Sequence, residues 1–191
     1  MATVREGNQA VLLIVDMQNG VMSESWQAPR VIDNVLHALQ RARAQDVPVV
    51  WVQHADHNLP HGSPQWQWVS ALAPRTGEPL VDKQFNSSFE QTALDDELRQ
   101  LGATHIVLAG AMTNWCIRAT AYGALERGYD VTLVSDAHTT STMALEGGIT
   151  IEAADVIEEL NVALTWLSYP GRKNGAVRAQ ALDFARPGGA A

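Results

Sequence analysis

The sequence predicts an α/β domain whose sheet is mainly parallel and is covered by helices on both faces. Segments with the character of strands and of helices alternate along the chain, which is typical of parallel sheets joined by crossover helices. In addition, residues 10–15 (AVLLIV) form a continuous apolar run that stops at Asp16. Such runs are typical of strands that are buried on both faces, as the strands of parallel sheets are.

The first half of the chain begins with this strand and continues with a helix and a long loop. Residues 29–45 are expected to form the helix, because apolar side chains recur at helical spacing from Ile32 to Leu39 and Pro29 suits the first turn. Residues 54–79 are rich in His, Trp, Pro and Gly and are expected to form the loop. The expected strands of this half are residues 10–15, 47–53 and 80–82.

The second half repeats the alternation and ends in a short tail. Gly102 and Gly128 each follow an expected helix, at the position where glycine commonly ends one, and Thr92 and Asp95 have the spacing of a capping box. The tail, about residues 185–191, is expected to be flexible. The expected elements are helices at 92–101, 114–127 and 148–167, and strands at 104–109, 129–135 and 176–181.

Composition narrows the class of protein. A chain of 191 residues with 46% hydrophobic and 18% charged residues is expected to form a single globular domain, residues 1–191. The net charge is −8 and no Lys/Arg cluster occurs, so we expect neither a nucleic-acid partner nor an anionic membrane. The single cysteine excludes an internal disulfide. Because no signal-peptide pattern or membrane-spanning apolar run is present, we expect a cytoplasmic protein.

Three reactive side chains follow expected strands. Asp16 ends the first strand in the segment VDMQN, Lys83 ends the third in VDKQF, and Cys116 comes shortly after the fourth in GAMTNWC. Ligands of open α/β sheets bind beyond the carboxyl ends of the strands. The three side chains are therefore expected to lie at one edge of the sheet.

Together these side chains fit acyl transfer through a thioester. Thr113 and Asn114 are good N-cap residues, which would place Cys116 at a helix N-terminus. The helix dipole and the ammonium of Lys83 would both favour the thiolate. Asp16 can take the thiol proton and later activate water. Backbone N–H groups of the same turn can stabilise an oxyanion.

The segments VLLIVDMQN, GEPLVDKQFNSSF and GAMTNWCIRATAYGALERGYDVTLVSDA, in this order, resemble the isochorismatase-like cysteine hydrolases. That family includes nicotinamidases, N-carbamoylsarcosine amidase and ureidoacrylate hydrolase. The resemblance covers roughly residues 9–167. Its most specific part is the Gly-x-x-Thr-x-x-Cys segment that ends at Cys116, followed beyond its helix by Gly128 and Tyr129.

The resemblance implies a fold and a catalytic apparatus. The fold is a Rossmann-like three-layer α/β/α arrangement with a six-stranded, mainly parallel sheet in the order 3-2-1-4-5-6. Asp16, Lys83 and Cys116 become the catalytic triad, and no cofactor is expected. The backbone N–H groups of Met112 and Cys116 become the oxyanion hole, and the Ala111–Met112 peptide bond is expected to be cis. Members of the family are commonly homodimers or homotetramers, so we expect a homo-oligomer.

The expected loop suggests an alternative with a metal. Nicotinamidases carry a metal site built from an Asp-x-His pair and a later His, and this loop holds His54, Asp56 and His61. The order of the residue types differs, since His precedes Asp here. We therefore expect no metal, with His54, Asp56 and His61 as the candidate ligands of the alternative.

Specificity is expected to depend on the loop at residues 54–79 and on side chains near the motifs. Gln18 follows Asp16 by two positions and is a candidate for orienting the substrate. Aromatic side chains often wall the pockets of the family, which makes Trp66, Phe85 and Trp115 candidate pocket residues.

The predicted function is a hydrolase that cleaves a C–N bond of a small molecule, in an amide, a ureide or a related group. One alternative is an isochorismate-type vinyl ether hydrolase, a chemistry that does not need the nucleophile, so that Cys116 beside Lys83 favours amide chemistry. Another is a non-catalytic Rossmann-like binding protein. The first strand is followed by DMQNG, which lacks the glycine pattern of a dinucleotide cradle.

Overall fold

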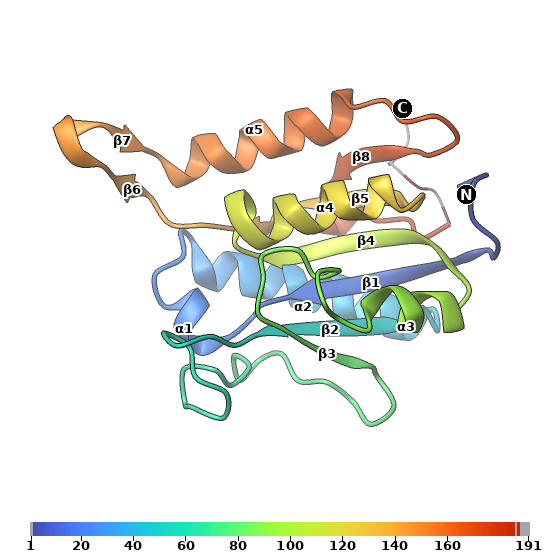
Figure 1. Cartoon of the computed structure of the whole chain (residues 1–191), viewed down its shortest axis with the longest axis horizontal. Helices are drawn as coiled ribbons and strands as arrows, with labels where there is room; N and C mark the ends of the chain where they lie inside the picture. The colour runs from blue at the N-terminus through green and yellow to red at the C-terminus, as the bar shows by residue number, and fades with distance from the viewer. Residues whose placement is uncertain (1, 186, 188–191) are drawn as a thin grey trace.

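A six-stranded parallel sheet forms the centre of the molecule (Figure 1). The computed structural model describes residues 2–185 and 187, so residues 186 and 188–191 of the predicted tail lie outside the described residues. The strand order β3-β2-β1-β4-β5-β8 confirms the order that the resemblance implies, because β8 is the sixth strand of this sheet. The strands are β1 (Gln9–Val15), β2 (Val49–His54), β3 (Leu80–Lys83), β4 (Ala103–Ala111), β5 (Asp130–Thr139) and β8 (Asn174–Val177).

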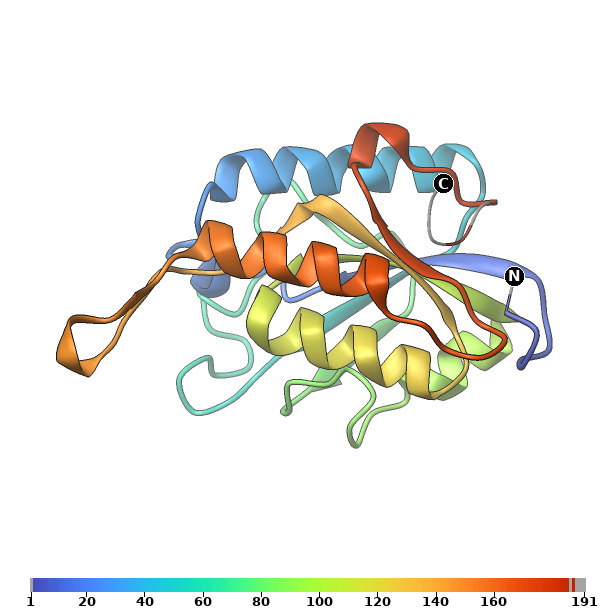
Figure 2. The same ribbon diagram turned by 90° about the horizontal axis from the view of Figure 1, so that it is seen from above.

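Helices cover both faces of the sheet, which confirms the three-layer arrangement (Figure 2). Leu12 and Ile14 of β1 pack into the core under α2, whereas Val11 and Leu13 pack into the core on the opposite face. All four side chains are fully buried, because alternate residues of a strand point to opposite faces. One face carries α2 (Ala28–Ala44), and the other carries α3 (Leu94–Gln100), α4 (Arg118–Glu126) and α5 (Ala153–Trp166). In the described part of the chain, no helix combines the length and apolar character that crossing a membrane requires.

The direction of the connections changes beside β1. Leu12 of this strand pairs with Val49 of β2 on one side and with Val107 of β4 on the other. The chain runs from β1 to β2 and β3, and then returns to the opposite side of β1 to form β4. Ligands of open α/β sheets bind beyond the strand ends at such a switch point. We therefore expect the functional site among the residues that follow β1 and β4, near the short helix α1 (Asn19–Met22).

A hairpin replaces the first part of the last predicted helix. The sequence predicts mostly helix over 148–167, yet α5 begins at Ala153 and is preceded by two antiparallel strands. Gly147 and Gly148 have φ angles of 82° and 77° in the turn between them, and a Gly-Gly pair is a recognised signal for such turns. Figures 1 and 2 show the hairpin extending away from the body of the molecule. Its parts are β6 (Met143–Ala144), the 3-10 turn η2 (Glu146–Gly148) and β7 (Thr150–Ile151).

The sixth strand of the sheet begins earlier than the apolar pattern predicts. The prediction is 176–181, whereas β8 ends at Val177 and is followed by the 3-10 turn η3 (Ala179–Ala181). The strand starts at Asn174, whose side-chain amide donates hydrogen bonds to the main-chain oxygens of Leu164 and Leu167, at 2.7 and 2.8 Å. Because the first residue of the strand is polar and binds the end of the helix, an apolar pattern does not mark where the strand starts.

Candidate active site

The backbone turns sharply at Asp16, directly after β1. Asp16 has a φ of 54°, in the left-handed region that few residues other than glycine adopt. The turn is held by two main-chain hydrogen bonds, from Asp16 N–H to the oxygen of Val52 and from Gln18 N–H to the oxygen of Asp16, at 2.9 and 2.8 Å. The carboxylate is 2% exposed. It therefore lies inside the protein at the carboxyl end of the sheet.

Lys83 reaches the same place from the edge of the sheet. It is the last residue of β3, which lies two strands away from β1, about 10 Å at the usual strand spacing. The long side chain crosses the end of β2 and is completely excluded from solvent. Burial opposes a charged ammonium and is the largest single effect, but the charge of Asp16, the interaction with Cys116 and the hydrogen bonds to both together raise the pKa of Lys83 above its ordinary value. Lys83 therefore remains a cation.

Cys116 lies in the π-helical turn η1 (Thr113–Ile117), between β4 and α4. The first motif residue, Gly110, permits a close approach of β4 to β1, since a Cβ there would lie 2.0 Å from the carbonyl oxygen of Val15. The peptide bond between Ala111 and Met112 is cis, as the resemblance implies. The residues of the Gly-x-x-Thr-x-x-Cys segment thus form the turn that places the sulfur at the end of the sheet.

The polar residues before Cys116 anchor this turn and do not cap a helix as predicted. The N-cap position is Met112, which makes no side-chain capping hydrogen bond. Thr113 Oγ1 instead lies 2.9 Å from Nδ1 of His138, and Asn114 Oδ1 accepts a hydrogen bond of 2.6 Å from the hydroxyl of Thr140. Both contacts tie the turn to the end of β5 and the residue after it, because these side chains point toward the neighbouring strand. His138 is fully buried and its pKa is lowered to about 4 by that burial, which makes it a neutral anchor.

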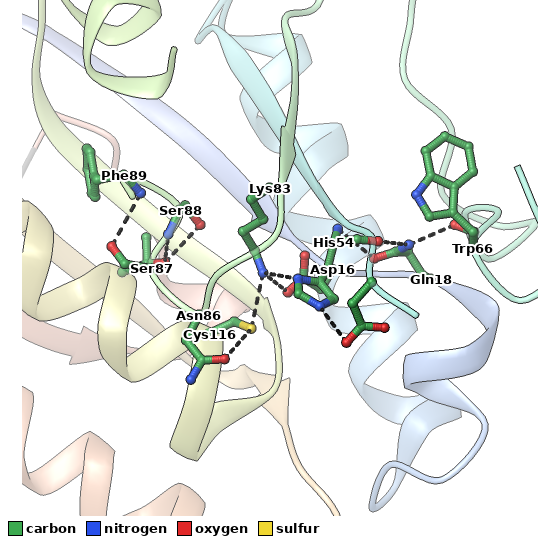
Figure 3. Close-up of polar contacts among 12 residues, drawn as sticks. Asp16, Gln18, His54, Trp66, Lys83, Asn86, Ser87, Ser88, Phe89 and Cys116 are labelled. Atoms are coloured by element: carbon green, nitrogen blue, oxygen red, sulfur yellow. Dashed lines mark hydrogen bonds and ion pairs between the residues drawn. The ribbon is translucent and has the colours of Figure 1, made fainter. Parts of the chain in front are cut away.

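The three predicted side chains meet at the carboxyl end of the sheet (Figure 3). Nζ of Lys83 lies 2.7 Å from Oδ2 of Asp16 and 3.2 Å from Sγ of Cys116. The other carboxylate oxygen of Asp16, Oδ1, is buried and has no hydrogen-bond partner among the described residues. A carboxylate, an ammonium and a sulfur from distant parts of the chain are thus in contact, and one carboxylate oxygen is left to accept a proton.

The ionisation of Cys116 differs from the sequence-based prediction of a stabilised thiolate. Its pKa is raised from 9.0 to about 12. Burial is the largest cause and the charge of Asp16 is the next, while the ammonium of Lys83 offsets only part of the increase. The lysine therefore does not suffice to ionise this sulfur. In the resting protein, Cys116 is a thiol beside a carboxylate.

We expect Cys116 in the folded protein to react with iodoacetamide about 10³-fold more slowly at pH 7.5 than in urea-unfolded protein, because only the thiolate reacts. A pKa of about 12 in place of 9.0 lowers the thiolate fraction accordingly. Intact-mass measurement between pH 7 and 10 tests this, since the chain has one cysteine. The folded rate should still rise at pH 10. A folded rate that levels off near pH 8 would contradict the raised pKa.

Comparison with known proteins identifies the family. The sequence matches the isochorismatase domain over residues 10–150, which is most of the chain and includes all three meeting side chains. The chain belongs to the isochorismatase family. A streptothricin hydrolase from Streptomyces noursei is 35% identical, and the match covers 75% of this chain and 60% of that relative. A ureidoacrylate amidohydrolase from Methylorubrum extorquens is 28% identical, with 75% of each chain covered.

The same fold occurs in a solved structure. A cysteine hydrolase from Pseudomonas syringae pv. phaseolicola 1448A superposes with a TM-score of 0.77 at 26% identity, covering 90% of this chain and 89% of that one. The chain spans only 60% of the length of the streptothricin hydrolase, so that relative contains a large part outside the match. All three related proteins named here are hydrolases by name.

The residues of the alternative metal site do not assemble in this family member. Nδ1 of His54 lies 3.4 Å from Nζ of Lys83, and its Nε2 lies 3.3 Å from Oδ2 of Asp56, so both ring nitrogens have partners. The ring of His61 packs against that of Trp66 in a tilted arrangement, with ring centroids 4.2 Å apart. Across residues 2–185 and 187, no group of three or more His, Cys, Asp or Glu is arranged to hold a metal ion. The described residues therefore do not fit the metal site of the alternative.

Two of the predicted pocket residues serve the scaffold. Gln18 is fully buried, and its side-chain amide binds only main-chain groups: it donates to the oxygens of His54 and Trp66 and accepts from the N–H of His54, at 2.9 to 3.0 Å. This corrects the prediction that Gln18 orients the substrate, because its amide is already occupied. Figure 3 shows the ring of Trp66 on the far side of Gln18 from Cys116. Trp66 therefore belongs to the loop that Gln18 fastens, away from the three meeting side chains.

The other two predicted pocket residues lie at the surface beside the site. Phe85 is 45% exposed and lines a cavity of about 400 Å³ that also reaches Lys83. Trp115 directly precedes Cys116 and is 51% exposed. Large exposed aromatic side chains next to buried polar groups are typical of ligand sites. Both positions remain candidates for contact with a substrate.

Sequence reasoning named His54 only as a candidate metal ligand, and it missed Asn86. His54 approaches Lys83, and Oδ1 of Asn86 lies 4.0 Å from Sγ of Cys116. The contact of His54 follows from strand register, since His54 and Lys83 are partners at the ends of β2 and β3. This pairing in the sheet, and not a metal-ligand pattern, is the feature that points to His54.

Proposed function

We propose that the protein hydrolyses a C–N bond of a small molecule, in an amide, a ureide or a related group, through a thioester on Cys116. The observation that carries the proposal is the contact of Lys83 Nζ with both Asp16 Oδ2 and Cys116 Sγ, at 2.7 and 3.2 Å. A base, a cation and a nucleophile in contact are the groups that acyl transfer requires. The names of the streptothricin hydrolase and the ureidoacrylate amidohydrolase support this reaction class.

In the first half of the proposed reaction, Asp16 takes the proton of the Cys116 thiol as the sulfur attacks the carbonyl carbon of the substrate. A C–S bond forms and the carbonyl electron pair moves to the oxygen. The backbone N–H groups of Met112 and Cys116 would bind this oxyanion, because the first N–H groups of a helical turn lack acceptors within the turn. The C–N bond then breaks, and the leaving nitrogen takes the proton from Asp16. The products of this half are the free amine or ammonia and the thioester.

Water completes the cycle by the same route. Asp16 takes a proton from water, whose oxygen attacks the thioester carbonyl. The C–S bond breaks, and the sulfur recovers the proton from Asp16 as the acid leaves. The sum of both halves is the addition of one water across the C–N bond.

The charges of the buried groups favour this path. At rest, Asp16 and Lys83 form an ion pair and Cys116 is neutral. After the proton moves from Cys116 to Asp16, the thiolate and Lys83 form the ion pair instead. The total charge of the cluster stays at zero throughout, which avoids the large cost of an uncompensated charge in a buried site. The raised pKa of the resting thiol is thus compatible with catalysis, because deprotonation is coupled to attack.

A panel of primary amides, ureides and carbamoyl compounds tests the proposal. We expect ammonia release from at least one member, and an acyl adduct on the single cysteine when the reaction is quenched and its intact mass is measured. A chelator should leave the rate unchanged. Hydrolysis of a vinyl ether without hydrolysis of any amide would favour the alternative chemistry. Activity that disappears with the chelator and returns with zinc or manganese would contradict the metal-free mechanism.

A further inference from the structure

We propose that His54 and Asp56 form a positioning pair that orients the ammonium of Lys83 toward Asp16 and Cys116. Neither residue touches the reacting atoms in this proposal. They act through Lys83, and Figure 3 shows His54 between Lys83 and Gln18. The inference rests on the proposed function for its effect on turnover, whereas its geometric part is tested without any substrate.

The ammonium of Lys83 has as many acceptors as it has hydrogens. A lysine ammonium carries three N–H donors and no acceptor. Among the described residues, three acceptor atoms lie near Nζ: Oδ2 of Asp16 at 2.7 Å, Sγ of Cys116 at 3.2 Å and Nδ1 of His54 at 3.4 Å. The lysine side chain has no exposed surface, so solvent does not supply a substitute. The contact with His54 therefore determines where the remaining two hydrogens point.

The same contact determines the protonation of the His54 ring. Because Lys83 can only donate, Nδ1 of His54 must accept and carries no hydrogen. The hydrogen of the neutral ring is then on Nε2, which lies 3.3 Å from Oδ2 of Asp56. Hydrogen bonds thus run in one direction, from Lys83 to His54 and from His54 to Asp56.

Asp56 is itself held in place as an ionised acceptor. Its Oδ1 accepts the backbone N–H groups of Asn58 and Leu59, both at 2.8 Å, which stops the carboxylate from rotating. Burial acts to raise the pKa of Asp56, but hydrogen bonds from Leu59, His54 and Asn58 outweigh it and lower the pKa below the ordinary value of 3.8. At neutral pH, a negative Oδ2 therefore faces Nε2 of His54.

Main-chain hydrogen bonds also fix the position of the His54 ring. Both main-chain groups of His54 are bound by the side-chain amide of Gln18, at 2.9 and 3.0 Å, and the N–H of Ala55 donates to the oxygen of Lys83 at 3.0 Å. His54 and Lys83 are register partners in β2 and β3. Gln18 is thus part of the support for this pair, which explains why a glutamine two residues after Asp16 is completely buried.

The substitution Asp56→Asn is a sharp test, because it changes neither the size of the side chain nor any contact of Lys83. Oδ1 is committed to two N–H donors, so the new NH₂ group must occupy the position of Oδ2. It would face Nε2 of His54 with a donor. The ring then has to accept at Nε2 and carry its hydrogen on Nδ1, where it points at the ammonium.

Nitrogen-15 NMR of histidine-labelled protein reads this change directly. We expect the Nε2–H form of His54 in the wild type and the Nδ1–H form in the Asp56→Asn variant, with the His54→Asn variant used to assign the signals. An Nδ1–H form in the wild type, or the same form in both proteins, would overturn the proposed direction of the hydrogen bonds. This measurement needs no activity, so a failure of the proposed hydrolase function leaves it interpretable.

Two rate measurements test the effect on the site. Iodoacetamide labelling of Cys116 at pH 9.5 should be about 10-fold or more slower in Asp56→Asn and His54→Leu, because a misdirected ammonium stabilises the thiolate less. With an amide substrate, kcat should fall about 10- to 100-fold in both variants, the expected worth of a hydrogen bond to a charged group, while KM changes little. His54→Asn keeps an acceptor oxygen near the position of Nδ1 and should stay close to the wild type. Wild-type labelling rates in Asp56→Asn and His54→Leu would refute the positioning role, even if His54→Leu has a lower melting temperature.

Discussion

Replacing Cys116 with alanine is expected to abolish amide hydrolysis, with a loss of kcat on the order of 10⁴-fold or more. The sulfur forms the covalent bond in both halves of the proposed reaction, and it is the single thiol of the chain. Asp16 and Lys83 remain in the variant as an ion pair, so water activation and the oxyanion hole are retained. The residual rate of the variant therefore reports the catalysis that Asp16, Lys83 and the oxyanion hole provide without the nucleophile.

The Cys116→Ser variant is the matched control for size. Its hydroxyl has a much higher pKa than a thiol, and a carboxylate is too weak a base to deprotonate it as it attacks the carbonyl carbon. We therefore expect a similarly large loss of kcat. The free energy of unfolding of both variants should change by no more than about 1 kcal/mol, because one small side chain is altered and the ion pair is kept. Turnover within tenfold of the wild type in either variant would rule out the thioester mechanism.

The family resemblance implies the strand order, whereas the meeting of the three side chains follows from local signals in the sequence. The apolar run before Asp16 marks a strand buried on both faces, and the polar residues at strand ends mark the carboxyl edge of the sheet. Gly110 is part of the same pattern for a physical reason, since a Cβ there would collide with the carbonyl oxygen of Val15. These features are local because each depends on a residue and its immediate strand neighbours.

The ionisation of the site depends instead on distances that no local pattern contains. A thiol after an N-cap residue predicts a lowered pKa, whereas burial of Cys116, and after it the charge of Asp16, raises that pKa. The partners of His54 likewise come from the register of β2 against β3. The start of β8 at Asn174 was hidden because the polar side chain binds the end of α5. In each case, a contact across the fold decides the outcome.

Breaking the ion pair from either side is expected to destabilise the fold by about 3–5 kcal/mol, and removing both charges together is expected to restore most of that loss. Lys83→Met leaves the carboxylate of Asp16 buried without its cation, and Asp16→Asn leaves the ammonium without its anion. The two groups are 2.7 Å apart and almost fully buried, so water cannot compensate either one. In the double variant, two neutral side chains of similar size fill the same space.

Urea unfolding of the wild type, the two single variants and the double variant measures the coupling. The raised pKa of Lys83 means that its contribution to stability is fully present below the ordinary value of 10.5 and is lost as the pH rises through its folded value, so the comparison belongs at pH 7. All three variants should lack hydrolase activity, because each lacks the base, the cation or both. A double variant that is stable but inactive would show that the protein keeps this buried pair for its chemistry, since the fold does not need it. If the losses of stability in the two single variants simply add in the double variant, the pairing is contradicted. Asp16 and Lys83 would then each be compensated by a different group.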